Sequence, residues 1–293
     1  MTLKAGLKRI LAVAGIDYRS IYGRLFHWSL RAAIRQQSVA RLLPRLGAIQ
    51  PNLSQQYSRQ SGMLGTFQEL KIRALHSFQC ELVLDELSSR DGEGEVTIVD
   101  IGDSAGTHMR YVAALAAPAC RVNAISVNLD QRAIDKIRAG GGTALLCRAE
   151  DLDLGERAVD LFVTFEMLEH LHNPALFLRR LAKSKNGARL LVTVPYQKQS
   201  RVGLQSLRRG DRLEDYAEDV HIYEFCPEDW RLLMLHSGWR VEREATYFQY
   251  PRGIPIVSSF LARLWRQNDF EGFWGAVLVR DLTLSDRYLD WDD

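Results

Sequence analysis

Residues 96–108 read VTIVDIGDSAGTH, an apolar and β-branched run that ends in a turn with glycines at positions 102 and 106. The run predicts a buried strand. The glycines let the backbone turn sharply and approach a ligand closely, and the residues through 115 continue as a helix. This stretch therefore predicts a strand–turn–helix unit, which in open α/β sheets binds ligands beyond the carboxyl end of the strand.

The chain beyond this unit alternates between apolar runs and helical patterns. Further strands are predicted at residues 121–127, 144–148, 158–165, 188–194, 239–248 and 273–280, and helices at residues 130–139, 174–184 and 227–237. Such alternation implies a parallel sheet with helices on both faces. We predict an α/β fold, a Rossmann-like, doubly wound and mostly parallel seven-stranded sheet with an N-terminal helical extension.

A turn-rich segment, SSRDGEGE at residues 88–95, separates two parts of the chain. We expect residues 1–90 to form a basic helical extension and residues 91–293 to form the α/β domain. Residues 66–87 predict a long helix, with Thr66 as its cap and Glu69 completing a capping box.

The first part of the chain is strongly basic. Residues 1–68 contain ten Lys or Arg residues and a single acid, Asp17, although the whole chain has a net charge of only +2. A helical projection of residues 21–35 places apolar side chains on one face and three arginines on the other. The favoured interpretation is a helix packed on the main domain, and the alternative is peripheral contact of residues 1–50 with an anionic membrane.

Composition excludes several classes of protein. The apolar content of 46% and charged content of 25% are ordinary for a globular chain, and no apolar run approaches the roughly 18 residues of a membrane span. The cysteines (Cys80, Cys120, Cys147 and Cys226) are scattered, which indicates neither a disulfide framework nor a zinc site. We expect no metal and a cytoplasmic location, either free or peripheral at the inner membrane.

The glycine turn resembles motif I of class I S-adenosylmethionine-dependent methyltransferases, an acid followed by G-x-G-x-G. Asp100, Gly102 and Gly106 match this motif, and Ser104 replaces the middle glycine. The resemblance implies that the loop holds the methionine part of S-adenosyl-L-methionine. The alternative is a tight turn without a ligand; a dinucleotide fingerprint and a P-loop both fail on the spacing.

Two later segments strengthen the resemblance. Residues 159–174, VDLFVTFEMLEHLHNP, and residues 221–230, HIYEFCPEDW, are similar to segments of the type 11 and ubiquinone-pathway-like branch. The resemblance covers about residues 96–241, with weaker support to residue 280.

The resemblance also implies cofactor contacts. Asp151, in an A-E-D-L segment, is expected to bind the adenine amine, and Glu166 is assigned to the cofactor side. The acid that usually binds the ribose is missing: Ser126 stands at the expected position, with Asn128 and Asp130 beyond it. Asn128 is expected to accept a ribose bond, while Asp130 either folds back or caps the next helix.

Histidines supply the candidate catalytic groups, because imidazole titrates near neutrality. A sulfonium methyl is already activated, so the protein must mainly align the nucleophile, and a hydroxyl acceptor also needs a base. We favour His170 and His221 as the pair, with Glu169 orienting His170, over His172. A packing role for these side chains is the alternative.

Residues 197–220 form a long, charged connection that predicts a substrate lid or a solvated loop. Its arginines are expected to hold phosphate or carboxylate groups on the acceptor; they are Arg201, Arg208, Arg209 and Arg212.

The sequence thus predicts methyl transfer to a small-molecule, sugar or lipid-linked acceptor, with an oxygen nucleophile favoured. The first rival is a non-catalytic scaffold or partner subunit at a membrane surface, because the motif departs at Ser104 and the ribose acid is missing. A nucleic-acid methyltransferase that holds phosphates with residues 1–68 is a weaker rival, since no nucleic-acid motif accompanies the basic residues.

Overall fold

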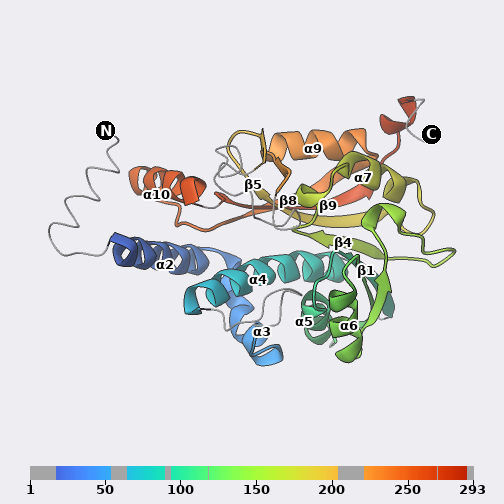
Figure 1. The fold of residues 1–293 in the computed structure, drawn as a ribbon, viewed down its shortest axis with the longest axis horizontal. Helices are drawn as coiled ribbons and strands as arrows, with labels where there is room; N and C mark the ends of the chain where they lie inside the picture. Colours follow the sequence, from blue (N-terminus) through green and yellow to red (C-terminus); the bar gives the residue numbers. More distant parts are fainter. Residues whose placement is uncertain are drawn as a thin grey trace.

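A computed structural model describes residues 18–53, 65–89, 94–117, 119–203, 221–268 and 270–288. Its centre is a seven-stranded sheet in the order β3-β2-β1-β4-β5-β9-β8 (Figure 1). The five strands from β1 to β5 run parallel, and β9 is antiparallel to both β5 and β8. This arrangement confirms the predicted fold. The strands are β1 (Glu95–Ile101), β2 (Arg121–Asn128), β3 (Thr143–Leu146), β4 (Leu161–Phe165), β5 (Arg189–Tyr196), β8 (Trp239–Phe248) and β9 (Gly272–Arg280).

Helices cover both faces of the sheet, with α7 and α9 on one side and α4 and α5 on the other (Figure 1). A two-stranded ribbon of β6 (Arg201–Val202) and β7 (Tyr223–Glu224) stands apart from the main sheet. The helices are α2 (Tyr18–Gln36), α3 (Leu43–Ile49), α4 (Thr66–Ser88), α5 (Thr107–Ala116), α6 (Gln131–Ala139), α7 (Pro174–Lys183), α9 (Pro227–His236) and α10 (Pro255–Asn268).

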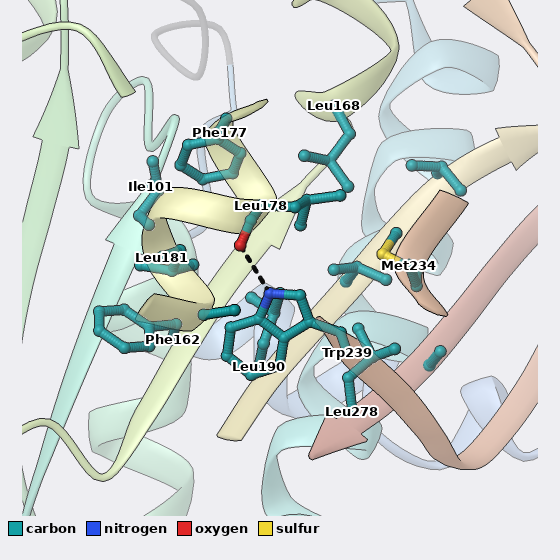
Figure 2. Close-up of a cluster of buried hydrophobic side chains, with 14 of the residues drawn as sticks. Ile101, Phe162, Leu168, Phe177, Leu178, Leu181, Leu190, Met234, Trp239 and Leu278 are labelled. Atoms are coloured by element: carbon teal, nitrogen blue, oxygen red, sulfur yellow. Dashed lines mark hydrogen bonds between the residues drawn. The ribbon is translucent and has the colours of Figure 1, made fainter. Parts of the chain in front are cut away.

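The face under α7 and α9 holds the largest apolar cluster. Trp239, fully buried at the start of β8, donates its indole N–H to the Leu178 carbonyl of α7 over 2.9 Å (Figure 2). Leu190, Met234 and Leu278 surround the ring, so the indole fastens α7 to the antiparallel end of the sheet. A buried indole needs such an acceptor, since an unpaired N–H costs free energy.

Helix α4 covers the opposite face. It packs closely because Gly275 of β9 has no side chain: a Cβ there would lie 2.5 Å from the Leu82 Cδ1 atom. The predicted helix is confirmed, but its predicted cap is wrong. Gly65 is the N-cap residue, and its N–H donates to the Gln68 side chain over 3.2 Å, while Glu69 instead pairs with Arg73 one turn later.

The N-terminal helix α2 packs against α10. Leu30 and Ile34 of α2 share a buried cluster with Leu261 and Trp265 of α10, and the Trp265 indole donates to the Ser29 hydroxyl over 3.0 Å. The structure thus has the packed helix that the sequence interpretation favoured. Its arginines face outward, as expected; they are Arg24, Arg31 and Arg35. Helix α10 itself was not predicted.

We expect Trp239→Ala to lower the free energy of unfolding by about 3–5 kcal/mol, because it opens a cavity between α7 and the sheet. Urea unfolding measures this loss. Trp28→Ala is the matched control, because Trp28 is 53% exposed and its loss should cost no more than about 0.5 kcal/mol. Equal effects of the two substitutions would contradict the central role of Trp239.

Candidate functional site

At the end of β1, the fold buries the side chain of Asp100 and constrains the backbone of Gly102. Asp100, the last residue but one of β1, is almost fully buried, and Gly102 follows the strand with φ +103°. The Gly102 N–H donates to the Val127 carbonyl at the end of β2 over 2.8 Å. A Cβ on Gly102 would lie 2.8 Å from the Met167 Cγ atom. Glycine is therefore required here both by the backbone conformation and by the close approach of the β4 loop.

Asp103 holds the rest of this loop in place. One carboxylate oxygen accepts from the backbone N–H groups of Ala105, at 3.2 Å, and Gly106, at 2.8 Å. The other accepts from the Ser126 hydroxyl over 2.7 Å. The two backbone donors immediately before α5 thus already have an anionic partner, and negative charge is favourable near a helix N-terminus. The sequence prediction did not include Asp103; the D-x-x-G spacing, typical of a side chain folded back onto its own turn, was the available signal.

Asn128 and Asp130 lie at the end of β2, as the sequence predicts. The Asn128 amide donates to the Asp103 carbonyl over 3.0 Å, and its oxygen accepts from the Asp130 N–H over 2.8 Å. Asp130 caps α6 by accepting from the Arg132 N–H. Of the alternatives for Asp130, the structure thus shows the capping role. Asn128 therefore lies beside the loop after β1, and its amide group stabilises that loop through the bond to Asp103.

Asp100 contacts a buried histidine network that reaches into α4. The His108 ring lies 4.0 Å from the carboxylate, and its other nitrogen pairs with the Gln79 side chain over 2.9 Å. Gln79 donates in turn to Thr193 of β5, and the His76 ring packs edge-on against His108 at 4.5 Å. Helix α4, from the predicted extension, therefore helps to build the loop's surroundings.

Burial sets the charge states in this network. Burial, and then the charge of Asp103, raises the pKa of Asp100 well above its usual range. Burial lowers the pKa of His108 to about 4, against the opposing effect of Asp103. His108 is therefore a neutral imidazole at physiological pH, and it does not neutralise the Asp100 carboxylate.

The Asp100 carboxylate provides a test of cofactor fit. Its Oδ2 atom is buried and has no hydrogen-bond partner among the described residues. An ammonium group would supply both a donor and the missing positive charge. The methionine part of S-adenosylmethionine carries such a group, so Asp100 fits it. The N–H groups of Ala105 and Gly106 do not contribute in the same way, because Asp103 already occupies them.

A second cluster lies just after β4. The predicted catalytic residues Glu169, His170 and His221 come together, with His170 and His221 edge-on at 4.6 Å between ring centroids. Glu169 is fully buried, with one oxygen 4.0 Å from the His170 Nε2 atom. The Glu169 carbonyl accepts from the Ile222 N–H over 2.8 Å, which holds the residue-221 segment against the turn.

Packing also fixes the charge states of this cluster. His221 stacks on Phe270, with centroids 4.8 Å apart. Burial lowers the pKa of His221 to about 3, with further lowering by His170 and Lys71. Burial, and then the charge of Glu166, raises the pKa of Glu169 well above its usual range. His221 is thus neutral at physiological pH and can accept a hydrogen bond.

Ligand-type side chains gather at two places among the described residues. The ligand atoms lie within 4.8 Å of one another in the group Glu169, His170 and His221, and likewise in the group Asp100, Asp103 and His108. In the second group, hydrogen bonds from the loop and from Ser126 already use both oxygens of Asp103.

The other predicted site residues are more dispersed. Ser104 is half-buried within the loop, and Glu166 has φ +51° at the β4 end, a conformation that few non-glycine residues adopt. Asp151 ends a short 3₁₀ turn, where its side chain is 63% exposed and lies 4.0 Å from Arg148. His172 is exposed.

The predicted lid falls mostly outside the described residues. Three of its arginines are outside the described residues; they are Arg208, Arg209 and Arg212. Arg201 is described, and it pairs with the fully buried Glu224 across the β6–β7 ribbon. Because its guanidinium already compensates a buried carboxylate, the prediction that Arg201 holds the acceptor is not supported by its geometry.

Residues 99–192 match the sequence model of a family described as "Methyltransferase domain". Among curated proteins, none matches this chain significantly. The matched segment runs from within β1 to within β5 and includes both clusters except His221.

Solved structures share the fold at low sequence identity. The [4+2]-cyclase SpnF is 14% identical with a TM-score of 0.52, over 82% of this chain and 93% of that one. Magnesium protoporphyrin IX methyltransferase from Synechocystis PCC 6803, with bound S-adenosylhomocysteine, is 14% identical with a TM-score of 0.50, over 75% and 90%. 1,6-Didemethyltoxoflavin-N1-methyltransferase from Burkholderia thailandensis is 13% identical with a TM-score of 0.50, over 71% and 79%.

The family match over residues 99–192 and the shared fold agree with the predicted methyltransferase domain. They leave the acceptor and the finer branch open. The ligand edge of the sheet is where the two clusters lie, so the site is built at the place that the fold dictates.

Asp100→Asn should stabilise the protein at neutral pH. Because the folded pKa of Asp100 is raised, its favourable contribution is complete below the unfolded pKa and is lost as pH rises through the folded pKa. The neutral amide removes that loss, worth about 1.4 kcal/mol per pKa unit. Urea unfolding at several pH values should show a gap between variant and wild type that widens from acid to neutral pH. A gap independent of pH would contradict the buried charge.

Proposed function

We propose that this protein transfers the methyl group of S-adenosylmethionine to an oxygen nucleophile of a small-molecule, sugar or lipid-linked acceptor. The observation that carries the proposal is the cluster of Glu169, His170 and His221 beside the Asp100 loop. Met167 links the two, because it packs on Gly102 and immediately precedes the turn that holds Glu169 and His170.

On the donor side, Asp100 would bind the ammonium group, and Gly102 gives close access to the backbone. We assign Asn128 to the ribose through its remaining acceptor capacity, and Asp151 to the adenine amine. The exposure of Asp151 leaves its carboxylate open to such a donor. Ser104, Gly106 and Glu166 would complete the walls of this site.

S-Adenosylmethionine supplies an electrophilic methyl group on a sulfonium. The protein must then place the acceptor hydroxyl in line and take up its proton. His170, with 24% of its side chain exposed, is the member of the cluster that an acceptor can reach. His221 is a neutral partner behind it, and the buried Glu169 serves as a positioning residue.

The histidine pair is the reason for preferring an oxygen acceptor. The structural relatives include a porphyrin methyltransferase, an N1-methyltransferase and a cyclase, so this fold alone does not determine the acceptor. A hydroxyl benefits most from a nearby base, whereas a carboxylate or phosphate needs less help. The ubiquinone-pathway-like branch stays a prediction that rests on residues 159–174.

We further propose that residues 91–293 form the catalytic domain, with residues 197–220 closing over the acceptor and residues 1–90 as an extension. Residues 1–50 would bring the protein to an anionic membrane, where a lipid-linked acceptor would lie.

Calorimetry with S-adenosylmethionine tests the donor site. The wild-type protein should bind it, and Asp100→Ala should weaken binding by at least about tenfold, because the ammonium loses its anionic partner. Asp135→Ala, on the exposed face of α6, is the control and should bind as wild type. Absence of binding at millimolar concentration would refute the methyl-transfer proposal.

Substitution of the histidines tests the acceptor side. His170→Ala and His221→Ala should each lower kcat by about 10²- to 10⁴-fold with an alcohol acceptor, while donor affinity is unchanged. His172→Ala is the matched control, since this neighbouring ring is exposed, and it should retain activity. A chelator should leave the rate unchanged. Equal losses in all three variants would contradict the assigned base.

A non-catalytic role is the second candidate, and a specific observation favours it. Asp103 already satisfies the N–H groups of Ala105 and Gly106, and the amide of Asn128 braces the same loop. A loop so completely bonded holds its shape without a ligand. This candidate would be supported if the calorimetry gave no binding, and methyl transfer to any acceptor would exclude it.

A further inference from the structure

Two helices that are far apart in the sequence form one outward surface. Phe26 of α2 packs edge-on against Trp265 of α10 at 4.6 Å, and the Arg252 N–H, before α10, donates to the Gln36 side chain at the α2 end. The helices therefore run antiparallel, and Figure 1 shows them projecting together at one end of the molecule. We call their exposed side the α2–α10 surface.

The α10 part of this surface is unusually apolar. Leu261, Ala262, Leu264 and Trp265 point into the shared core, and further large aliphatic and aromatic side chains are exposed on α10 and on the turn just before it. Residues of this kind are expensive to leave in water, and their clustering on one short stretch marks an interaction site. The exposed fractions are 65% for Ile254, 84% for Ile256, 36% for Val257 and 57% for Phe260.

The α2 part supplies positive charge. Arg24, Arg31 and Arg35, together with Trp28, line a surface hollow of about 330 Å³. Neither α2 nor α10 contains an acidic residue, and Arg252 and Arg263 add exposed positive charge beside the apolar α10 residues. Glu271, after α10, is within 3.6 Å of Arg266 and so does not offset these exposed arginines.

We propose that the α2–α10 surface docks on an anionic lipid bilayer, with Ile256 and Phe260 entering the interface and the α2 arginines binding lipid phosphates. Trp28 has the amphipathic ring that suits the level of the head groups. Among the described residues no helix is both long enough and apolar enough to cross the bilayer, so the proposed contact lies in the plane of the membrane.

Charge argues against the other occupants of this surface. A second copy of the chain would pair the surface with itself, and its arginines would then oppose arginines. Nucleic acid would match the arginines but would leave the aliphatic side chains of α10 without a partner. An anionic bilayer satisfies both parts, because basic groups bind its head groups while apolar groups leave water.

The inference extends the proposed membrane contact of residues 1–50 to α10, and it does not depend on methyl transfer. The test needs no methyl donor: the full chain is sedimented with vesicles of phosphatidylcholine, either alone or mixed with phosphatidylglycerol. We expect binding to the mixed vesicles that weakens as salt rises. Absence of binding to the mixed vesicles would overturn the proposal and leave the methyltransferase proposal untouched.

Variants separate α10 from the basic N-terminus. Ile256→Glu with Phe260→Glu should weaken vesicle binding by at least about tenfold, because two apolar side chains no longer leave water. The milder pair Ile256→Ser with Phe260→Ser should act in the same direction, and thermal unfolding checks that each variant is folded. Arg31→Glu with Arg35→Glu should remove the preference for phosphatidylglycerol.

Leu232→Glu is the matched control, because Leu232 on α9 is 53% exposed and lies outside the α2–α10 surface. It should bind vesicles as wild type does. Undiminished binding by the folded α10 variants would overturn the proposal, and so would an equal loss in Leu232→Glu. A dimer in light scattering that the α10 variants dissociate would also overturn it, by assigning the surface to a second copy.

Discussion

The Asp103 carboxylate joins the elements that meet at the ligand edge of the sheet. It accepts from the backbone N–H groups of the two residues just before α5 and from Ser126 in β2, while the Asp103 carbonyl accepts from Asn128. The loop after β1 therefore has one shape, set by hydrogen bonds to a charged group, which are stronger than neutral ones. The positions of Asp100 and Gly102, and through Gly102 the approach of Met167, depend on that shape.

This ordered loop has an electrostatic cost, because it holds a buried carboxylate at Asp100. Burial, and then the nearby charge of Asp103, disfavours ionisation of Asp100 and so raises its pKa. Helix α4 places Gln79 between His108 and Thr193. A buried carboxylate without a hydrogen-bond partner is unfavourable for stability but useful for binding a cation. The Asp100 carboxylate is thus both an unfavourable buried charge and the group proposed to bind the methyl donor.

The molecule divides its tasks between two regions. The carboxyl edge of the parallel strands carries the neutral histidines and the buried acids, while α2 and α10 carry exposed arginines and aliphatic side chains. The antiparallel end of the sheet connects the two regions. Strand β8 leads through a short turn into α10, and β9 then pairs with β5. An enzyme that acts on a lipid-linked molecule would need such a pairing of site and surface.

The sequence by itself determined the succession of strands and helices along the chain, the glycine loop and the family resemblance. These depend on local features, namely apolar runs, turn residues and short motifs, which read the same in any context. The placement of Asp130 as a helix cap followed from the same local rules. The prediction that Glu169, His170 and His221 act together required the sheet to bring residue 221 back to the β4 turn, and the structure shows this meeting.

Only the tertiary structure decided the roles of Asp103, Arg201 and α10. In the sequence, Asp103 is one of many acids, and only the structure shows that Ser126 and the backbone just before α5 donate to its carboxylate. In the sequence, Arg201 resembles the other arginines of the predicted lid, and only the structure shows that it forms an ion pair with the buried Glu224. Helix α10 has large apolar side chains that are buried and others that are exposed, and it packs against α2, which lies more than two hundred residues earlier in the chain. Long-range packing, which no local pattern contains, made these three assignments.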